Sequence, residues 1–312
     1  MKKVDKLLYK MNEEESKINI IKDKLINILD IKEDDIYKVE TVGGMTNKNY
    51  LANIRGIDYI LRIPGISTES MINRSNEKRN SKLAFKLGID TEILYFNEDT
   101  GIKISKFINN SETLSPRTAK IEENMELTTS ILRKLHNSNI KFENEFNVFD
   151  EIKKYELLLK QMNSYNFQDY EYVKDKVIQL DKILNQLGKD TKPCHNDTVP
   201  ENFVKGDNDR IYLIDWEYSG NNDPMWDLAA HIIECNFNEY EEEMFLQKYF
   251  ETSNIEDKYL NKILIYKICQ DFLWSLWTKI KEANGDDFGS YGIERYNRAK
   301  QNLLKIDRMY NE

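Results

Sequence analysis

The chain has 312 residues, and its 45 Lys and Arg against 54 Asp and Glu give a net charge of −9 at pH 7. Hydrophobic residues make up 40% and aromatic ones 11%, which excludes wholesale disorder and suffices for one large or two modest domains. The acidic balance argues against a nucleic-acid partner, which usually needs a basic surface. No apolar run approaches the roughly 20 residues that span a bilayer, so we expect no membrane insertion.

The first third of the chain predicts a small sheet with helices. Residues 12–30 carry apolar side chains at three- and four-residue steps, which is typical of a helix. Residues 36–65 alternate apolar and polar positions around two glycine-containing turns, which indicates two or three antiparallel strands. Residues 68–87 have a helical pattern and two short strand-like segments follow. We expect an N-terminal lobe over residues 1–110.

The remainder of the chain predicts a larger, mainly helical lobe over residues 111–312. Its pattern is helical from about 116 to 190 and again from about Pro224 onward. Between these, residues 200–215 form a predicted hairpin whose turn is the sequence GDND. The expected fold class is therefore α+β with two lobes, and such an arrangement places its ligand cleft between the lobes. The oligomeric state cannot be predicted from these patterns.

Cysteine usage and the N-terminus favour a cytoplasmic protein. Cys194, Cys235 and Cys269 have no CxxC spacing and are odd in number, so buried reduced thiols are expected. The N-terminus is basic like a signal peptide, but charges interrupt it before an apolar stretch forms. We therefore predict no secretion.

The most informative segment is HNDTVPEN, followed across the hairpin by IDWE. It places Asn202 five residues after Asp197, and Asp215 thirteen residues after Asn202, which is the spacing that phosphoryl transfer requires. Asp197 would deprotonate a hydroxyl nucleophile, while Asn202 and Asp215 would hold Mg²⁺ against nucleotide phosphates. Glu217 is a candidate further oxygen ligand of the hard cation. The alternative is that the first segment is only a turn and the second only a strand end.

These two segments resemble the phosphotransferase loop of the choline and ethanolamine kinase family, within the aminoglycoside phosphotransferase superfamily. The sequence LIDWEYSGNNDPMWDLA is especially similar to bacterial choline kinases, and the resemblance spans roughly residues 40–300. It implies a protein-kinase-like two-lobe fold that uses ATP and Mg²⁺. It also implies that His195 orients the catalytic loop and that Asp227 braces the backbone of that loop.

The resemblance also places a nucleotide loop in the sequence GGMTNKNY. Gly44 with Thr46 and Asn47 could lay backbone N–H groups over phosphates, as a turn between two strands can. Alone, a pair of glycines is more often an ordinary hairpin turn. The assignment therefore depends on the downstream motifs.

Arg62 lies in a predicted strand where protein kinases carry a phosphate-contacting lysine, and the resemblance makes Glu77 its ion-pair partner. Arginine in place of lysine keeps the charge and adds bidentate geometry. The alternative is an edge-strand arginine that points to water. Ser105 and Phe107 lie in the expected link between the lobes, where backbone groups would meet adenine.

An aromatic and acidic set in the C-terminal half indicates the substrate class. Aromatic faces with a carboxylate form the usual cage for a quaternary ammonium, whose charge cannot be satisfied by hydrogen bonds. From composition alone, aromatic residues at helical spacing are more often core. The resemblance reverses that expectation because Trp274, Trp277 and Tyr291 match positions of a choline pocket. The proposed substrate-binding residues, with Asp197, are Tyr218, Glu234, Trp274, Trp277, Phe288 and Tyr291.

We therefore predict ATP-dependent phosphorylation of the choline hydroxyl. One rival is a kinase of the same fold that acts on ethanolamine, thiamine or an aminoglycoside. An aminoglycoside enzyme would need several carboxylates where this chain has tryptophans. The other rival is an inactive module that binds quaternary ammonium, but such a module has no need to keep Asp197, Asn202 and Asp215 together.

Overall fold

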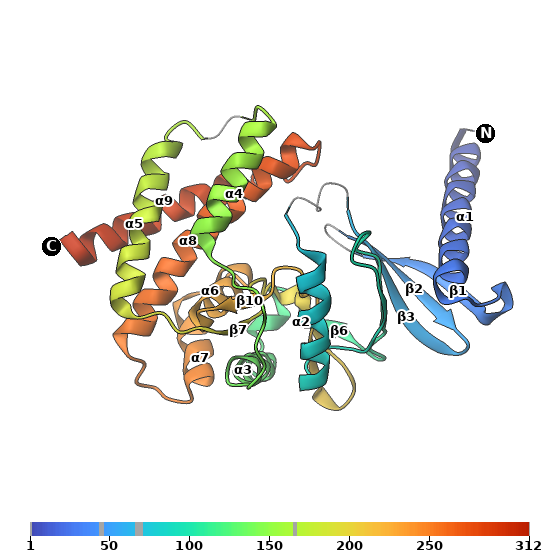
Figure 1. The fold of residues 1–312 in the computed structure, drawn as a ribbon, viewed down its shortest axis with the longest axis horizontal. Helices are drawn as coiled ribbons and strands as arrows, with labels where there is room; N and C mark the ends of the chain where they lie inside the picture. The colour runs from blue at the N-terminus through green and yellow to red at the C-terminus, as the bar shows by residue number, and fades with distance from the viewer. Residues whose placement is uncertain (1, 44–46, 66–70, 165–166, 312) are drawn as a thin grey trace. The chain divides into compact units, whose positions relative to one another are not determined.

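The computed structural model describes residues 2–43, 47–65, 71–164 and 167–311. The chain forms two compact units (Figure 1). The first comprises residues 1–78 and 91–110, and the second comprises residues 79–90 and 111–312. Helix α2 (Arg74–Leu87) begins in the first unit and ends in the second.

The first unit is a five-stranded antiparallel sheet with a long N-terminal helix. The strand order in the sheet is β1-β2-β3-β5-β4. The elements are α1 (Lys2–Leu29), β1 (Ile36–Val42), β2 (Lys48–Ile54), β3 (Ile57–Ile63), β4 (Ile93–Phe96) and β5 (Lys103–Lys106).

The turn between β2 and β3 fixes the register of the sheet. Arg55 and Gly56 both have positive φ, at 52° and 81°, which is the backbone that a tight two-residue hairpin requires. This turn pairs Ile54 with Ile57 and sets every later pair of the ladder. Side chains on alternate positions of β2 are therefore buried on one face of the sheet.

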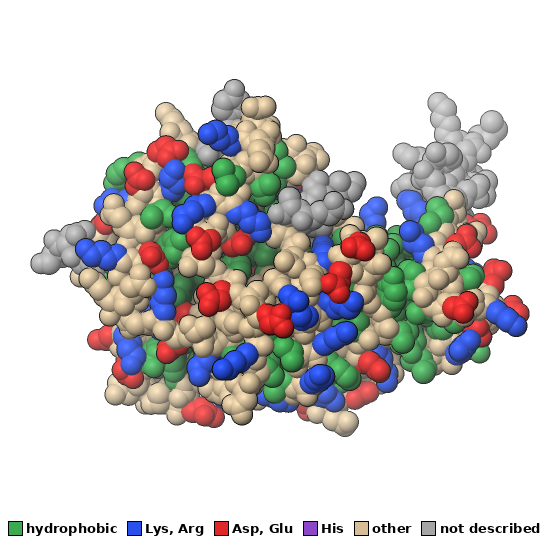
Figure 2. Space-filling view, in the orientation of Figure 1, with side chains coloured by type: hydrophobic (Ala, Val, Ile, Leu, Met, Phe, Trp, Pro, Cys, Tyr) green, Lys and Arg blue, Asp and Glu red, His purple; other side chains and the backbone are tan. Residues whose placement is uncertain are grey.

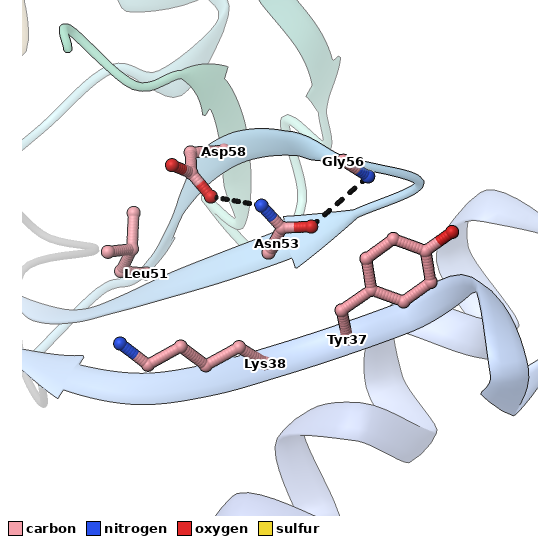
Figure 3. A pocket seen from close by; sticks show the side chains of 6 residues that line it. All are labelled: Tyr37, Lys38, Leu51, Asn53, Gly56 and Asp58. Atoms are coloured by element: carbon pink, nitrogen blue, oxygen red, sulfur yellow. Dashed lines mark hydrogen bonds between the residues drawn. The ribbon is translucent and has the colours of Figure 1, made fainter.

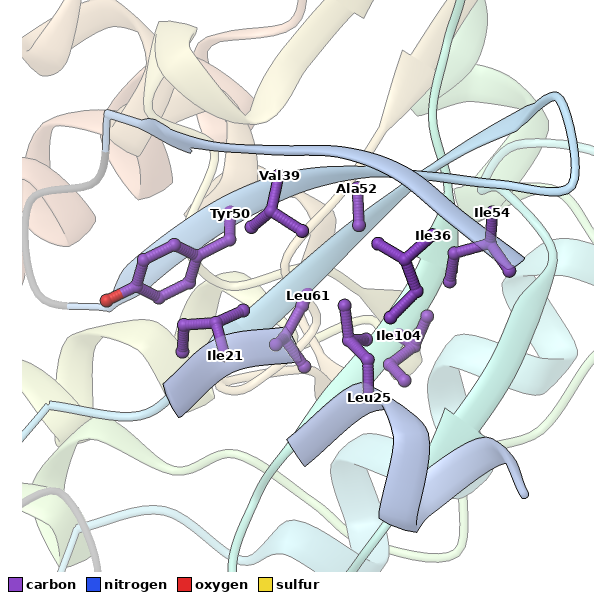
Figure 4. Close-up of a cluster of buried hydrophobic side chains, with 9 residues drawn as sticks. All are labelled: Ile21, Leu25, Ile36, Val39, Tyr50, Ala52, Ile54, Leu61 and Ile104. Carbon is purple, nitrogen blue, oxygen red and sulfur yellow. The ribbon is translucent and has the colours of Figure 1, made fainter. Parts of the chain in front are cut away.

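Helix α1 covers that buried face. Ile21 and Leu25 point from the helix into a cluster of aliphatic side chains on the strands, as Figure 4 shows. Leu25 and the facing Leu61 and Ile104 are fully buried. The predicted helix over residues 12–30 is confirmed, although it already begins at Lys2.

The second unit is mainly helical around two small sheets. Strands β6, β8 and β9 form one sheet in that order, and β7 pairs with β10 in the other. The elements are β6 (Glu112–Thr113), α3 (Glu122–His136), α4 (Val148–Gln161), α5 (Tyr170–Leu187), β7 (Lys192–Cys194), β8 (Phe203–Lys205), β9 (Ile211–Leu213), β10 (Gly220–Asn222), α6 (Pro224–Glu234), α7 (Glu239–Phe250), α8 (Asp257–Ala283) and α9 (Tyr291–Asn311).

Helix α8 is the centre of this unit because α4, α5, α6 and α9 pack around it. Most of its second half is buried, including polar residues such as Gln270 and Asp271. A helix that is buried on nearly all sides has no single apolar face. In agreement with this, apolar residues of α8 occur on all sides of the helix. The predicted helical region beyond Pro224 and the hairpin over residues 200–215 are both confirmed.

Some predicted boundaries were wrong. The helix predicted over residues 68–87 begins at Arg74, because the Asn73 side chain accepts a hydrogen bond from the Asn76 amide and caps the helix there. Among its described residues, the helical region predicted over 116–190 contains the α-helices α3, α4 and α5, and a non-helical segment at 137–147 separates the first two. Strands β6, β7 and β10 were not predicted since each has at most three residues, too few to show alternation.

Positive and negative side chains are interspersed over the molecular face in Figure 2, without a broad field of one sign. Among the helices of the described ranges, none is long and apolar enough to cross a membrane. All three cysteines are buried free thiols, as predicted.

We predict that Leu25→Ala lowers the free energy of unfolding by about 2–5 kcal/mol, because it leaves a cavity under the sheet. Ile20→Ala is the matched control on the same helix, since that side chain is 54% exposed. Urea denaturation followed by circular dichroism measures both variants. Equal effects of the two substitutions would contradict the packing of α1 on the sheet.

Candidate active site

The loop after β7 is held by one buried carboxylate. Asp227 on α6 is fully buried, and its two oxygens accept the backbone N–H of His195 at 2.8 Å and of Asn196 at 2.7 Å. His136 Nε2 lies 3.0 Å from the same carboxylate. Hydrogen bonds to an ionised acceptor are about twice as strong as neutral ones. Asp227 therefore fixes the loop to α6, and the predicted brace is present in the structure.

Asn196 turns the chain sharply ahead of Asp197. Its φ is 67°, in the left-handed region that asparagine tolerates better than most residues. Its side chain donates to the Tyr218 carbonyl at 3.0 Å and accepts from Asn222 at 2.9 Å. The sequence reasoning passed over this residue, although an asparagine between His and Asp is itself a turn signal.

Asp197 and Asn202 are joined directly. Asn202 Nδ2 donates to the Asp197 carbonyl at 2.8 Å and lies 3.4 Å from its carboxylate Oδ2. The Asn202 carbonyl accepts from the Ile214 amide at 2.9 Å, which brings the segment containing Asp215 beside the loop. The predicted spacing of these residues thus corresponds to one local cluster.

The cluster is crowded with negative charge. Burial raises the pKa of the Asp197 carboxyl well above its usual value, and the nearby charges of Asp215, Glu217 and Glu234 raise it further. Asp215 also has a φ of 66°, a strained conformation for aspartate that persists only where its surroundings impose it. Strain and a shifted pKa in one place are typical of functional sites.

The donors at this cluster suit a hard cation. Asp215 and Glu217 offer carboxylate oxygens, and Asn202 uses its Nδ2 toward Asp197, so that its amide oxygen can serve as a ligand. Oxygen-only donor sets are what Mg²⁺ and Ca²⁺ prefer. A divalent cation would also relieve the repulsion that raises the pKa of Asp197.

Within the described ranges, His136, Cys194 and Asp227 form a buried group whose potential metal-ligand atoms all lie within 4.8 Å of one another. Asp227 already accepts two backbone N–H groups, and Cys194 Sγ contacts the Asn222 carbonyl. Burial raises the pKa of the Cys194 thiol, which keeps it protonated. These contacts support a structural role for the three side chains.

The predicted aromatic residues come together in the second unit. Ring centroids lie 5.2 Å apart for Tyr218 and Trp274, 6.2 Å for Trp274 and Trp277, and 5.1 Å for Trp277 and Phe288. Asp197 is close enough to Tyr218 to raise the pKa of its phenol, after the larger effects of burial and of Tyr155. Tyr218 follows Glu217 directly in the chain, so the aromatic row begins at the segment that carries Asp215 and Glu217.

Two cations that were not predicted contact this region. Arg295 on α9 forms an ion pair with Glu234 and donates to the Tyr291 hydroxyl at 2.8 Å. Lys281 Nζ lies 5.7 Å from the centre of the Trp277 ring. Glu234, which was predicted to bind the substrate, therefore already pairs with a cation of the protein. The signal for Arg295 was its position one turn after Tyr291, which places both on one face of a helix.

The segment before α4 packs closely against Gly220 of β10. A Cβ at this position would lie 2.7 Å from Asn144 Nδ2. Asn80 Nδ2 lies 3.0 Å from both Asn144 Oδ1 and the Ser219 hydroxyl. This amide network joins the segment before α4 to β10, and the sequence reasoning missed it because its members are far apart in the chain.

The predicted nucleotide residues belong to the first unit. Gly44 and Thr46 lie outside the described residues, and Asn47 is described and buried. Ser105 lies in β5 and pairs with Ile60 of β3. The Phe107 amide donates to the Asp58 carbonyl at 3.0 Å.

The predicted ion pair between Arg62 and Glu77 is present at 2.6 Å, and both residues are buried. This excludes the alternative of an arginine that points to water. Arg74 and Lys103 also contact the Glu77 carboxylate, at 2.8 and 3.5 Å. The sequence reasoning missed both. Arg74 follows the helical i, i+3 pattern, whereas Lys103 reaches Glu77 through strand pairing that a single sequence does not reveal.

A pocket on the first unit lies elsewhere on the sheet (Figure 3). It is lined by residues of β1 to β3, including Tyr37, Lys38 and Asp58. The Asn53 side chain, which also lines the pocket, donates a hydrogen bond to Asp58 at 2.6 Å and accepts one from the Gly56 amide at 3.1 Å. Its lining contains none of the predicted site residues that the structure describes, so it does not bear on the phosphoryl-transfer chemistry.

We predict that Asp227→Ala lowers the melting temperature by several degrees and abolishes turnover. The substitution leaves two buried N–H groups without an acceptor, at a cost of about 1–3 kcal/mol each. Asp209→Ala is the control, because it removes an exposed aspartate paired with Lys205. Thermal unfolding and an activity assay report both effects. Wild-type turnover in the Asp227 variant would show that the loop does not need this brace.

Comparisons with known proteins agree with this geometry. The family model for choline/ethanolamine kinase matches residues 39–300. Protein LicA from Haemophilus influenzae is 37% identical over 273 residues, which cover 85% of this chain and 80% of that protein.

Solved structures extend the likeness to the fold. Choline kinase LicA from Streptococcus pneumoniae is 43% identical with a TM-score of 0.80, over 92% of this chain and 98% of that one. A structure of LicA in complex with AMP is 42% identical with a TM-score of 0.79, over the same shares. The ADP-bound aminoglycoside phosphotransferase APH(2'')-Ib, at 14% identity and a TM-score of 0.60 over 86% and 93%, shares the fold alone. The predicted kinase-like fold is confirmed, and the chain belongs to the choline/ethanolamine kinase family.

Proposed function

We propose that this protein transfers the γ-phosphate of ATP to the hydroxyl of choline, and that the cluster around Asp197 carries the reaction. Family membership supports the reaction class, and LicA at 43% identity is itself described as a choline kinase. The observation that carries the proposal is that a half-buried cluster of carboxylates and an aromatic row meet at Tyr218, the residue that follows Glu217. A phosphate donor and an alkylammonium alcohol both require such charge and shape complementarity.

Asp197 is the proposed base. It accepts the hydroxyl proton of choline while the choline oxygen forms a bond to the γ-phosphorus. The bond between that phosphorus and the bridging oxygen of ADP breaks, and ADP leaves with the electron pair. Burial and the surrounding carboxylates raise the proton affinity of Asp197, which suits this task.

Asn202 and Asp215 are the proposed ligands of Mg²⁺, with Glu217 in support. The cation would supply positive charge to the β- and γ-phosphates and to the crowded carboxylates. Asn202 remains tied to Asp197 by its Nδ2, so the metal site and the base are oriented together. His195 keeps a structural role: its Nε2 lies 2.9 Å from the Ile214 carbonyl, next to Asp215.

For ATP we propose the sequence-derived set in the first unit. Arg62, oriented by Glu77, would contact phosphates as a fixed bidentate cation. The backbone near Gly44, Thr46 and Asn47 would cover the phosphates. Ser105 and Phe107 would contact adenine through backbone groups.

For choline we propose the aromatic row with Tyr291 as the ammonium site. Faces of Trp277, Tyr218 and Tyr291 would stabilise a desolvated quaternary cation by about 0.5–2 kcal/mol each. Trp274 and Phe288 contact Trp277 edge-on and hold its ring in place. Glu234 contributes to the acidic side of the site while paired with Arg295.

A coupled ADP-release assay over choline, ethanolamine, thiamine and an aminoglycoside tests this function. We expect the highest kcat/KM with choline and measurable turnover only with nucleotide and a divalent cation present. Release that is fastest with another alcohol would reassign the substrate within the fold. Flat traces for all of them would support a binding module.

We predict that Asp197→Asn lowers kcat by about 10²–10⁴-fold, which is the usual effect of removing a positioned general base. Nucleotide binding, measured by calorimetry, should stay near the wild-type value because the variant keeps the size and the Asn202 contact. The control is Asp207→Asn in the exposed β8–β9 turn. An Asp197 variant that keeps more than a tenth of the wild-type kcat would reject its role as the base.

We also predict that Asp215→Ala abolishes turnover and weakens the dependence on Mg²⁺. The reason is that a carboxylate beside Asn202 is the strongest hard-cation ligand in the cluster. The activity of the wild type and any residual activity of the variant are titrated against Mg²⁺ and Mn²⁺. A sample with EDTA gives the activity without metal. Full wild-type activity in EDTA, or an unchanged titration in the variant, would contradict the metal assignment.

A further inference from the structure

The Glu234 carboxylate at the proposed ammonium site already has a cationic partner. Arg295 Nη1 donates to Glu234 Oε1 and to the Tyr291 hydroxyl, so one guanidinium nitrogen joins both residues. Arg295 is only 3% exposed. A buried, bidentate-capable cation of this kind is a fixed part of the protein and not a mobile surface side chain.

This contact lies within electrostatic reach of the candidate base. The Glu234 charge is among those that raise the pKa of Asp197. Burial raises the pKa of the Tyr291 phenol to about 12, with Arg295 opposing the shift and Glu234 and Asp197 contributing to it. Arg295 therefore joins two of the proposed substrate-binding residues, Glu234 and Tyr291, and sets the charge where they meet.

Arg295 also contacts a second carboxylate, Asp271. Asp271 on α8 accepts two hydrogen bonds from Arg298, at 2.7 and 2.6 Å, and its Oδ1 lies 3.3 Å from Arg295 Nε. A Cβ at Gly292 would lie 2.9 Å from Thr278, so the glycine lets the first turn of α9 approach α8 closely. Arg295 is therefore held between two carboxylates, Glu234 on α6 and Asp271 on α8.

The position of Arg295 leaves one of its buried donors unsatisfied, which costs stability. Arg295 Nη2 is buried and has no hydrogen-bond partner among the described residues. An unsatisfied buried donor lowers the stability of the folded state. A residue kept at that cost beside the proposed substrate site is a candidate for a functional role.

We propose that Arg295 is a positioning residue that makes the site prefer quaternary over primary ammonium, because it occupies the Glu234 carboxylate. This inference rests on the proposed function. A primary ammonium has three N–H donors and loses affinity where acceptors are already taken. A trimethylammonium has no N–H to donate, so it loses nothing when Glu234 is paired and gains from the aromatic faces. The positive charge of Arg295 repels both substrates alike, whereas the missing acceptor affects only the primary amine.

The test compares kcat/KM for choline and ethanolamine in Arg295→Gln. We expect the choline-to-ethanolamine ratio to fall by about tenfold, as a charge-assisted hydrogen bond to Glu234 becomes available to ethanolamine. The KM for ATP should not change. Arg295→Lys keeps the charge and the ion pair, so its ratio should return toward the wild-type value. An unchanged ratio in folded Arg295→Gln, or an equal loss for both alcohols, would overturn the proposal.

Two further variants make the test decisive. Lys300→Gln is the matched control, since Lys300 lies on the same helix as Arg295 but pairs with Asp169, and it should leave the ratio unchanged. In the double variant Arg295→Gln with Glu234→Gln the carboxylate is gone, so the ratio should recover. A ratio that stays low in the double variant would contradict the role of Glu234.

Glu234→Gln alone covers the case in which Arg295→Gln does not fold. If Glu234 is already occupied, its replacement leaves the ratio within about twofold of wild type. If Glu234 binds ammonium directly, ethanolamine loses more than choline and the ratio rises, which would overturn the proposal. Wild-type protein without activity on any amino alcohol would instead reject the proposed function and is distinguished by the ADP-release assay.

Discussion

The carboxylate of Asp227 is the constraint on which the site depends. It joins α6 to the two amides that precede Asp197, and it does so from a position without solvent access. In water these hydrogen bonds would be exchanged for bonds to solvent, but inside the protein an unpaired partner would be costly. The loop is therefore held in one conformation, and the left-handed turn at Asn196 and the position of Asp197 follow from it.

The same site brings several carboxylates together. Asp215, Glu217 and Glu234 all raise the pKa of Asp197, which means that their mutual repulsion is built into the fold. Such an arrangement destabilises the protein alone and favours binding of cations. The proposed reaction brings two of them, a divalent metal and an ammonium group. Arg295 pairs with Glu234. Asp215 and Asp197 are the carboxylates proposed for the metal and for the choline hydroxyl.

The sequence predicted the parts of the site that are local in the chain. Asp197, Asn202 and Asp215 are separated by a short turn and a hairpin, so their spacing alone indicated one cluster. The fold class followed from periodicity and from a resemblance whose motifs extend over most of the chain. The contact of Arg295 with Glu234 and that of Lys103 with Glu77 could not be predicted, since they depend on helix packing and strand register between distant segments. The amide network around Gly220 was missed for the same reason.

The most direct test of this account is a crystal structure of the protein with Mg²⁺, a non-hydrolysable ATP analogue and choline. The account predicts Mg²⁺ on the oxygens of Asn202 and Asp215, and the choline hydroxyl within hydrogen-bonding distance of Asp197. It also predicts the trimethylammonium against the rings of Trp277 and Tyr291, with the Glu234–Arg295 pair intact. A metal bound elsewhere, or an ammonium group that displaces Arg295 from Glu234, would contradict the division of roles among these carboxylates.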